Sequence, residues 1–348
     1  RWDRSNAPPK TIIATAPQWT GQNLNGRRIL VWDEQGLGDL VQFSRYLPLL
    51  AEAGAEVTAL CRKNMQRLLG ALPKPARFVE ALDRTIAYDY QSALLSLPRG
   101  FGTTLETIPA PRAYLHPEPD LIKKWAARVG ADGYRIGVCW RGNASINLKR
   151  SVPVSCFGAL AAIDGVRLIS LVKDEGDIGI ATPRGPRRIE SLGADFDAGP
   201  DSFIDCAAVM ASFDLIVTSD TAIAHLAGAL GRPVFVALKQ AADWRWLLER
   251  PDCPWYPTMR LFRQPERNQW TPVFDAIADE VEARVRERSR VAPFDAAPRS
   301  LVRPAAVVEA PAAAPDDAAL IAIPGAVGEL IDKITILEIK ESRVTDAL

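Results

Sequence analysis

Short apolar runs alternate with amphipathic segments along most of the chain. After the first such run, Leu40, Phe43, Leu47 and Leu50 recur at helical spacing and indicate a helix that begins at Asp39. Runs with the length of buried strands lie at residues 27–32, 55–60, 77–80, 93–97, 134–140, 166–172, 214–219 and 233–238. Strands that alternate with helices in this way predict βαβ units and parallel sheets.

The alternation stops at a proline-rich, charged stretch and starts again near residue 134. We therefore predict an α/β protein with two Rossmann-like parallel-sheet domains that face each other across a cleft. The predicted divisions are a linker or strap (1–25), an N-terminal domain (26–115), a joint (116–133), a C-terminal domain (134–290), an Ala/Pro-rich linker (291–320) and the start of a separate helical segment (321–348) that we expect to be truncated.

The charges of the chain balance, with 42 basic and 42 acidic residues. No overall field attracts nucleic acid, so we expect no such partner, and an anionic ligand must be held by local groups. The five cysteines are scattered, which argues against a disulfide framework or a zinc site and favours a reducing cytoplasm. No apolar run approaches the roughly 20 residues of a membrane span.

Residues 220–231 form the first candidate site, because a helix begins there directly after a buried strand. Asp220 can cap that helix, while Thr221 and Ala222 present backbone N–H groups that favour an anion such as phosphate. His225 lies one turn further on the same face. A well-capped helix with a packed histidine is the alternative interpretation.

Residues 139–153 form the second candidate, a polar loop that follows another strand. Its basic and amide side chains include Asn143, Lys149 and Arg150, and arginine can grip phosphate oxygens with two parallel hydrogen bonds. A solvated loop explains the same composition. Together with the helix start, the loop predicts a clamp for a diphosphate.

The turn at residues 33–39 is the third candidate, since Gly36 and Gly38 allow a close approach of the backbone. The third glycine of a dinucleotide fingerprint is missing. Asp39 is either a general base or the cap of its helix, and the pattern favours the cap. In the aromatic stretch 243–264, Trp244 and Arg245 are candidate cleft residues, although a rigid core explains most of its aromatic side chains.

Four stretches in this order resemble glycosyltransferase family 9, whose best-known members are bacterial heptosyltransferases: EQGLGDLVQFSRYLPLL, SLPRGFGTTLETIPAPRAYL, DTAIAHLAGALGRPVFVAL and DWRWLLERPDCPWYPTMRLFRQ. The resemblance covers roughly residues 19–288. It is strongest to the domain that follows tetratricopeptide repeats in bacterial proteins.

The resemblance implies a GT-B fold and an inverting transfer, without a metal, from a nucleotide-diphosphate sugar. It implies that Asp39 is the base, that Arg150 contacts the donor phosphates, and that Asp174 or Glu175 binds the ribose. It also implies that the helix start holds donor groups through Asp220, Thr221, Ala222 and His225.

These observations together predict a glycosyltransferase that uses no cofactor. The acceptor is a glycan, a lipid-linked molecule or a protein, and an N-terminal repeat domain is a further expected partner. The expected location is the cytoplasm, with the inner face of the membrane as an alternative. A non-catalytic nucleotide- or glycan-binding module and a nucleotide-sugar epimerase of similar fold remain as alternative functions.

Overall fold

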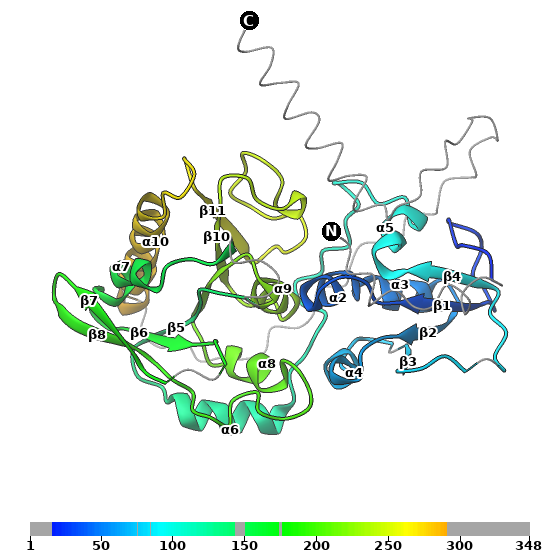
Figure 1. The fold of residues 1–348 in the computed structure, drawn as a ribbon, viewed down its shortest axis with the longest axis horizontal. Helices are drawn as coiled ribbons and strands as arrows, with labels where there is room; N and C mark the ends of the chain where they lie inside the picture. The colour runs from blue at the N-terminus through cyan, green and yellow to red at the C-terminus, as the bar shows by residue number, and fades with distance from the viewer. Residues whose placement is uncertain (1–15, 75, 84, 143–149, 174–175, 291–348) are drawn as a thin grey trace, which may run out of the picture.

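The computed structural model describes residues 16–290 except 75, 84, 143–149 and 174–175. Two parallel-sheet units lie side by side (Figure 1). The first sheet has the order β3-β2-β1-β4, with all pairs parallel. Its strands are β1 (Arg28–Trp32), β2 (Glu56–Leu60), β3 (Arg77–Val79) and β4 (Tyr90–Ala93).

Short helices connect or follow the strands of the first unit: α2 (Leu37–Phe43), α3 (Tyr46–Glu52), α4 (Lys63–Leu69), η2 (Leu94–Ser96) and α5 (Leu97–Gly100). The predicted strand at 93–97 is wrong, because β4 ends at Ala93 and helical turns follow it. Pro98 lies in the first turn of α5, where proline is tolerated, and a short apolar run does not by itself distinguish a strand from a buried helical turn.

The end of the predicted strap packs onto the first unit. Gln18 forms a parallel bridge with Gln91 of β4, and Trp19 is buried. The ring of Trp19 lies so close to Gly100 that a Cβ built there would be 2.3 Å from a ring carbon. This part of the strap therefore extends one edge of the sheet and fills the hydrophobic core.

The second sheet has the order β11-β10-β9-β5-β6-β8-β7, and all its pairs are parallel except the β7–β8 hairpin. Its strands are β5 (Tyr134–Cys139), β6 (Val166–Ser170), β7 (Ile178–Thr182), β8 (Gly185–Glu190), β9 (Leu215–Ser219), β10 (Val234–Leu238) and β11 (Met259–Arg263). Three of these strands, β7, β8 and β11, were not predicted. β8 carries too few apolar residues to stand out, and β7 is short and contains a glycine, although Pro183 and Gly185 indicate the turn between them.

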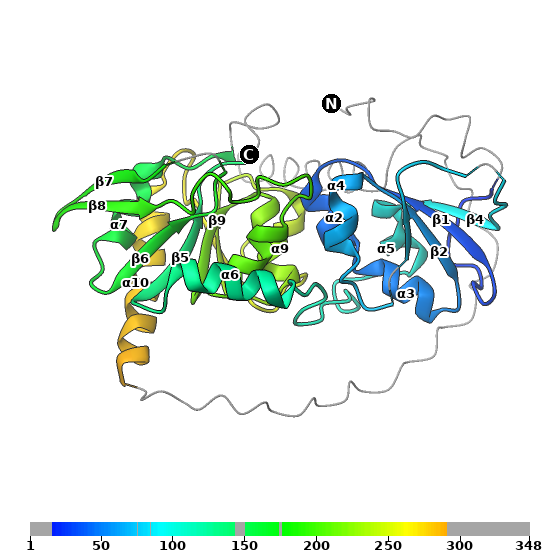
Figure 2. The same ribbon diagram turned by 90° about the horizontal axis from the view of Figure 1, so that it is seen from below.

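The helices of the second unit cover both faces of its sheet (Figure 2). They are η4 (Val154–Phe157), α7 (Gly158–Ala161), α8 (Ile204–Met210), α9 (Ala222–Ala229), η5 (Trp244–Trp246) and α10 (Thr271–Arg290). The predicted joint contains a further helix, α6 (Pro119–Val129), whose buried Trp125 donates a 2.6 Å hydrogen bond to Asp205 in α8. The chain between the units thus packs against the second one.

The two units meet where α2 lies beside α9, as Figures 1 and 2 both show. A Cβ at Gly38 would lie 2.8 Å from the His225 ring and 3.3 Å from the Cα of Ala222, so only glycine allows this approach. Across the same junction, the buried guanidinium of Arg45 donates to the carbonyl oxygens of Pro109 (3.1 Å) and Trp255. The junction is therefore packed like a core.

Gly228 in α9 provides a test of this packing. A Cβ there would lie 2.3 Å from Cδ1 of the buried Tyr256, so Gly228→Ala forces the ring or the helix to move. Overpacking lowers stability by about 1–3 kcal/mol, and the higher helix propensity of alanine offsets at most about 1 kcal/mol of this loss. We expect denaturant unfolding to show a net loss of about 1–2 kcal/mol.

Gly179 in β7 supplies the matched control, since a Cβ there meets nothing within 4 Å. Gly179→Ala should change the free energy of unfolding by no more than about 0.5 kcal/mol. Equal effects of the two substitutions would contradict the close packing of α9 against Tyr256.

Candidate functional site

The carboxyl ends of β5, β9 and β10 bring three candidate segments together. Arg150 follows β5, Asp220 directly follows β9, and Asp243 caps η5 after β10. The Nε of Arg150 lies 3.4 Å from Oδ2 of Asp220, and its Nη2 donates to Oδ2 of Asp243 at 3.2 Å. The predicted proximity of Arg150 to the start of α9 is thus present in the structure.

Arg245 links this cluster to the first unit. Its Nη1 donates to Oδ1 of Asp243 at 2.7 Å, and its Nη2 donates to Oδ1 of Asp39 in α2. The side chain is only 7% exposed, and the guanidinium carbon lies 5.0 Å from the centre of the Trp244 ring. The two candidate cleft residues therefore contact each other, and Arg245 joins carboxylates from both units.

Asp39 has the contacts of a helix cap as well as those of an ion-pair partner. Its Oδ2 accepts a 2.8 Å hydrogen bond from the backbone N–H of Gly36, which precedes α2. Asp39 is therefore not the N-cap that the sequence pattern favoured: Gly36 is the N-cap, and Asp39 stabilises the start of α2 from the third helical position. The side chain keeps 16% of its surface exposed, so capping does not remove it from solvent.

The start of α9 is more enclosed than the sequence suggested. Asp220 and Thr221 are buried and Ala222 is half-buried, and Gly38 of α2 lies against Ala222 and His225. The hydroxyl groups of Thr221 and Thr218 lie 3.1 Å apart. The helix start therefore borders the charged cluster, but α2 covers part of it.

His225 packs behind the helix start. Its Nδ1 lies 3.0 Å from the hydroxyl of Tyr256, and its ring stacks on Trp246 with the centroids 5.2 Å apart. Burial, together with the positive charge of Arg245, holds the pKa of the imidazole well below its usual value. The imidazole is therefore neutral at physiological pH, and its contacts are those of the packed-histidine interpretation.

The two buried aspartates of the cluster differ in charge balance. Burial raises the pKa of Asp220 above its usual value, and the nearby Arg150 only partly opposes this. Burial would also raise the pKa of Asp243, but Arg245 and Arg150 outweigh it and lower that pKa. Asp243 is consequently the carboxylate that holds the two guanidinium groups in place.

Several buried polar atoms at this junction have no hydrogen-bond partner within the described part of the chain. They are Ser219 Oγ and Arg245 Nε, together with Arg150 Nε, Asp220 Oδ2 and Trp246 Nε1. Of these, Arg150 Nε and Asp220 Oδ2 face each other as an ion pair at 3.4 Å, and the Trp246 side chain interacts with Asp220. Ser219 Oγ and Arg245 Nε are left without a partner among the described residues, and buried polar groups of this kind usually pair with protein, water or a ligand.

Glu34 was missed by the sequence analysis although it lies within the candidate turn at residues 33–39. It is 7% exposed, and its Oε2 lacks a hydrogen-bond partner among the described residues. Burial, with the added charges of Asp39 and Asp33, raises the pKa of its carboxyl from 4.5 to about 7. Two acidic residues at the end of a buried strand were the signal that could have revealed it.

The raised pKa of Glu34 predicts a stability that depends on pH. The folded state holds this proton more tightly than the unfolded state, so stability falls as the pH rises from 4.5 to about 7. Glu34→Gln removes the ionisation. Between pH 4.5 and 8, its stability relative to the wild type should rise by up to about 3 kcal/mol, measured by denaturant unfolding.

Glu282→Gln on α10 is a control for this measurement, since the Glu282 side chain is 49% exposed. It should show no comparable pH trend. A stability difference between Glu34→Gln and the wild type that is constant across this pH range would contradict the buried, titrating carboxyl.

Four predicted donor-binding residues, Asn143, Lys149, Asp174 and Glu175, lie outside the described residues. Across the ranges that are described, no three His, Cys, Asp or Glu side chains form a group that suits a metal ion. No helix in those same ranges is both long and apolar enough to cross a membrane.

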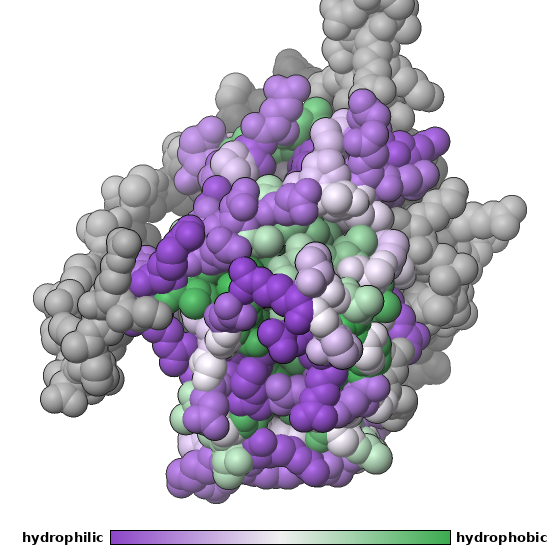
Figure 3. Space-filling model, turned by 90° about the vertical axis from the view of Figure 1, so that its left-hand side faces the viewer, coloured by the Kyte–Doolittle hydropathy of each residue, from purple (hydrophilic) through white to green (hydrophobic). Residues whose placement is uncertain are grey.

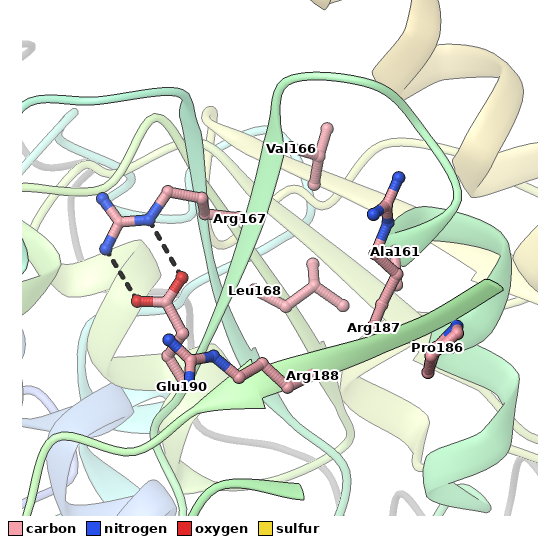
Figure 4. A pocket seen from close by; sticks show the side chains of 8 residues that line it. All are labelled: Ala161, Val166, Arg167, Leu168, Pro186, Arg187, Arg188 and Glu190. Atoms are coloured by element: carbon pink, nitrogen blue, oxygen red, sulfur yellow. Dashed lines mark hydrogen bonds and ion pairs between the residues drawn. The ribbon is translucent and has the colours of Figure 1, made fainter. Parts of the chain in front are cut away.

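A separate cavity of about 420 Å³ lies between β6 and β8, away from these residues. Figure 4 shows its lining, in which Arg167 of β6 pairs with Glu190 of β8, and Arg187 and Arg188 come from the same strand as Glu190. The face on this side of the molecule is mostly hydrophilic, with small apolar areas between the polar side chains (Figure 3). None of the predicted site residues lines this cavity.

The architecture as a whole is a GT-B fold, with two Rossmann-like parallel-sheet domains. It is similar to the ADP-heptose lipopolysaccharide heptosyltransferase II of E. coli, with a TM-score of 0.55 and 14% identity over 75% of this chain and 99% of that one. It is equally similar to a family 9 glycosyltransferase from Veillonella parvula, with a TM-score of 0.55 and 11% identity over 77% and 99% of the two chains. These similarities confirm the predicted fold.

The sequence comparisons give one family match and one curated relative. Residues 198–238, from the approach to α8 through β10, match the model of glycosyltransferase family 9 (heptosyltransferase). Protein FlbA of Caulobacter vibrioides is 29% identical over 310 residues, with 80% of this chain and 51% of FlbA covered. The chain thus spans about half the length of this curated relative. The family match and the fold together support a glycosyltransferase.

Proposed function

We propose that the protein is a glycosyltransferase whose nucleotide-diphosphate sugar binds at the junction of the two domains. The observation that carries this proposal is the convergence of Arg150 and Arg245 at the carboxyl ends of β5 and β10, beside the start of α9. Guanidinium groups suit phosphate oxygens because they offer parallel N–H donors. We expect the guanidinium groups to contribute more to diphosphate binding than the helix start, because α2 partly covers the helix start.

The reaction we propose is a direct displacement at the anomeric carbon. Asp39 accepts the proton of the acceptor hydroxyl as its oxygen bonds to the sugar, and the bond between the sugar and the diphosphate breaks. The electron pair leaves with the diphosphate, whose charge Arg150 and Arg245 stabilise. Attack from the face opposite the diphosphate inverts the anomeric centre. These side chains perform the transfer without a metal cofactor in this proposal.

The finer assignments belong to the same proposal. The sequence motifs favour the members of the family that follow tetratricopeptide repeats, so a repeat domain is the proposed partner in a full-length protein. The proposed acceptor is a glycan, a lipid-linked molecule or a protein. The proposed location is the cytoplasm or the inner face of the membrane, where nucleotide sugars are available.

Nucleotide binding is the first test. ADP, UDP and GDP are screened by thermal shift, since a ligand of the folded state raises its melting temperature, and the best one is measured by calorimetry. Arg150→Gln should weaken that binding at least about tenfold, because a charged contact to the diphosphate is lost.

The matched control is Arg184→Gln, which removes a surface arginine that pairs with Asp164 at 2.6 Å in the β7–β8 region. It should leave the dissociation constant unchanged. Failure of the wild type to bind any nucleoside diphosphate would contradict the proposed function and favour the non-catalytic alternative.

Asp39→Asn tests the proposed base. The amide oxygen of asparagine still accepts from the Gly36 N–H, so the helix cap is kept while the base is lost. Release of nucleoside diphosphate from the sugar nucleotide selected by the binding screen, with a cell extract as acceptor source, should fall about 10²–10⁴-fold.

Donor binding by this variant must survive for the interpretation to hold. Equal losses of binding and turnover would mean that Asp39 acts only as a structural cap. The epimerase alternative is examined with the same sample, because it requires NMR to detect an isomerised sugar nucleotide when no acceptor is added.

A further inference from the structure

Arg245 is shared between the two domains in a way that the proposed reaction does not by itself require. Its Nη1 is held by Asp243 of its own domain at 2.7 Å, and its Nη2 is held by Asp39 of the other domain. Its Nε is buried and has no partner within the described residues. The proposed base, Asp39, and the arginine proposed to bind the diphosphate, Arg245, are therefore already bonded to each other.

The balance of charges at the junction affects whether a diphosphate can bind to Arg245 while Asp39 is paired with it. Three carboxylates, Asp39, Asp220 and Asp243, surround two guanidinium groups, those of Arg150 and Arg245. A diphosphate adds further negative charge, and the carboxylates that already hold the guanidinium groups compete with it for their N–H donors. The carboxylate with the fewest other contacts is the one that the donor displaces most easily.

Asp39 is the carboxylate that can yield. Both oxygens of Asp243 are engaged, Oδ1 by the backbone N–H and Nη1 of Arg245 and Oδ2 by Arg150. Among the described residues, Oδ1 of Asp39 bonds to Arg245 alone, while Oδ2 accepts from the N–H of Gly36. Loss of the Arg245 contact therefore leaves Oδ1 of Asp39 open, while Oδ2 keeps its contact at the start of α2.

We propose that the diphosphate of the donor competes with Asp39 for Arg245, so that donor entry releases Asp39 to accept the proton of the acceptor. This inference rests on the proposed function. Arg245 is almost completely buried, and removing one partner from a buried ion-pair network is unfavourable. Asp243 holds Nη1 throughout, whereas Nη2 pairs with Asp39 before the donor binds and with the diphosphate afterwards.

The exchange orders the reaction. While Arg245 holds Asp39, the base is not available to an acceptor, and the acceptor hydroxyl keeps its proton. Once the diphosphate occupies Arg245, the same contact that stabilises the leaving group has freed the base. Donor therefore binds before a productive acceptor, and Arg245 is the residue that positions Asp39 according to donor occupancy.

The test measures the binding of a nucleoside diphosphate, which cannot react, to the full chain. Asp39→Asn removes the competing charge and should tighten the binding of ADP, or of the diphosphate selected by the screen, by about tenfold, because a pair this buried is stronger than an exposed one. Asp33→Asn is the matched control. Asp33 lies on the same turn but pairs with Arg62 at 3.2 Å, so its substitution should change the affinity at most about twofold.

A double-mutant cycle isolates the contact. In an Arg245→Gln background, Asp39→Asn should no longer tighten binding, since the site of competition is gone. Asp39→Gln serves as a second uncharged variant in case asparagine impairs folding, because glutamine at the third helical position can also accept from the N–H of the N-cap Gly36.

The outcomes separate this inference from the proposed function. Wild-type protein that binds no nucleoside diphosphate would overturn both. Wild-type binding that Asp39→Asn leaves unchanged or weakens would overturn the exchange alone, as would tightening that persists in the Arg245→Gln background. Binding that Asp39→Asn tightens when Arg245 is present, but not in the Arg245→Gln background, supports the exchange.

Discussion

The contact between α2 and α9 is the constraint on which the candidate site depends. Each helix begins after a strand of a different sheet, and the two come together only because Gly38 has no side chain to separate them from His225. Arg45 lies on one side of this contact and bonds to carbonyl oxygens from both domains. Arg245 joins Asp243 and Asp39 across the same junction. Packing and charge therefore hold the domains in the one arrangement that brings the turn after β1 to the ends of β9 and β10.

A neutral protein obtains a charged site by burying the charges in a small space. The chain has equal numbers of acidic and basic residues, yet five charged side chains converge at the domain junction. Reduced contact with water strengthens each interaction there. It also sets the protonation of neighbours, since His225 is kept neutral and Glu34 is held near its point of titration. Local placement, rather than net charge, thus decides what this surface can bind.

The sequence predicted the parts of the fold that follow from local pattern. Buried apolar runs identified β1, β2, β5, β6, β9 and β10, and the turn at Gly36–Asp39 identified the start of α2 to within two residues. The run at 93–97 misled because the same apolar residues fill a helical turn. The β7–β8 hairpin escaped because an edge of a sheet needs few apolar residues. The pairing of Arg245 with Asp39 joins residues 206 positions apart, and a local sequence pattern does not predict a contact between such remote residues. Glu34 was visible as a polar residue, but its burial is a property of the packed domain.

The hairpin at the margin of the second sheet also bears on how the molecule behaves in a crowded solution. β7 is the outermost strand and runs antiparallel to β8, and the neighbouring arginines form ion pairs, Arg184 with Asp164 and Arg188 with Asp177. A strand at the edge of a sheet presents unpaired N–H and C=O groups to a passing chain, whichever way it runs. The five-residue length of β7 and the nearby ion pairs make this edge a poor template. This margin of the protein is therefore protected against strand-by-strand aggregation.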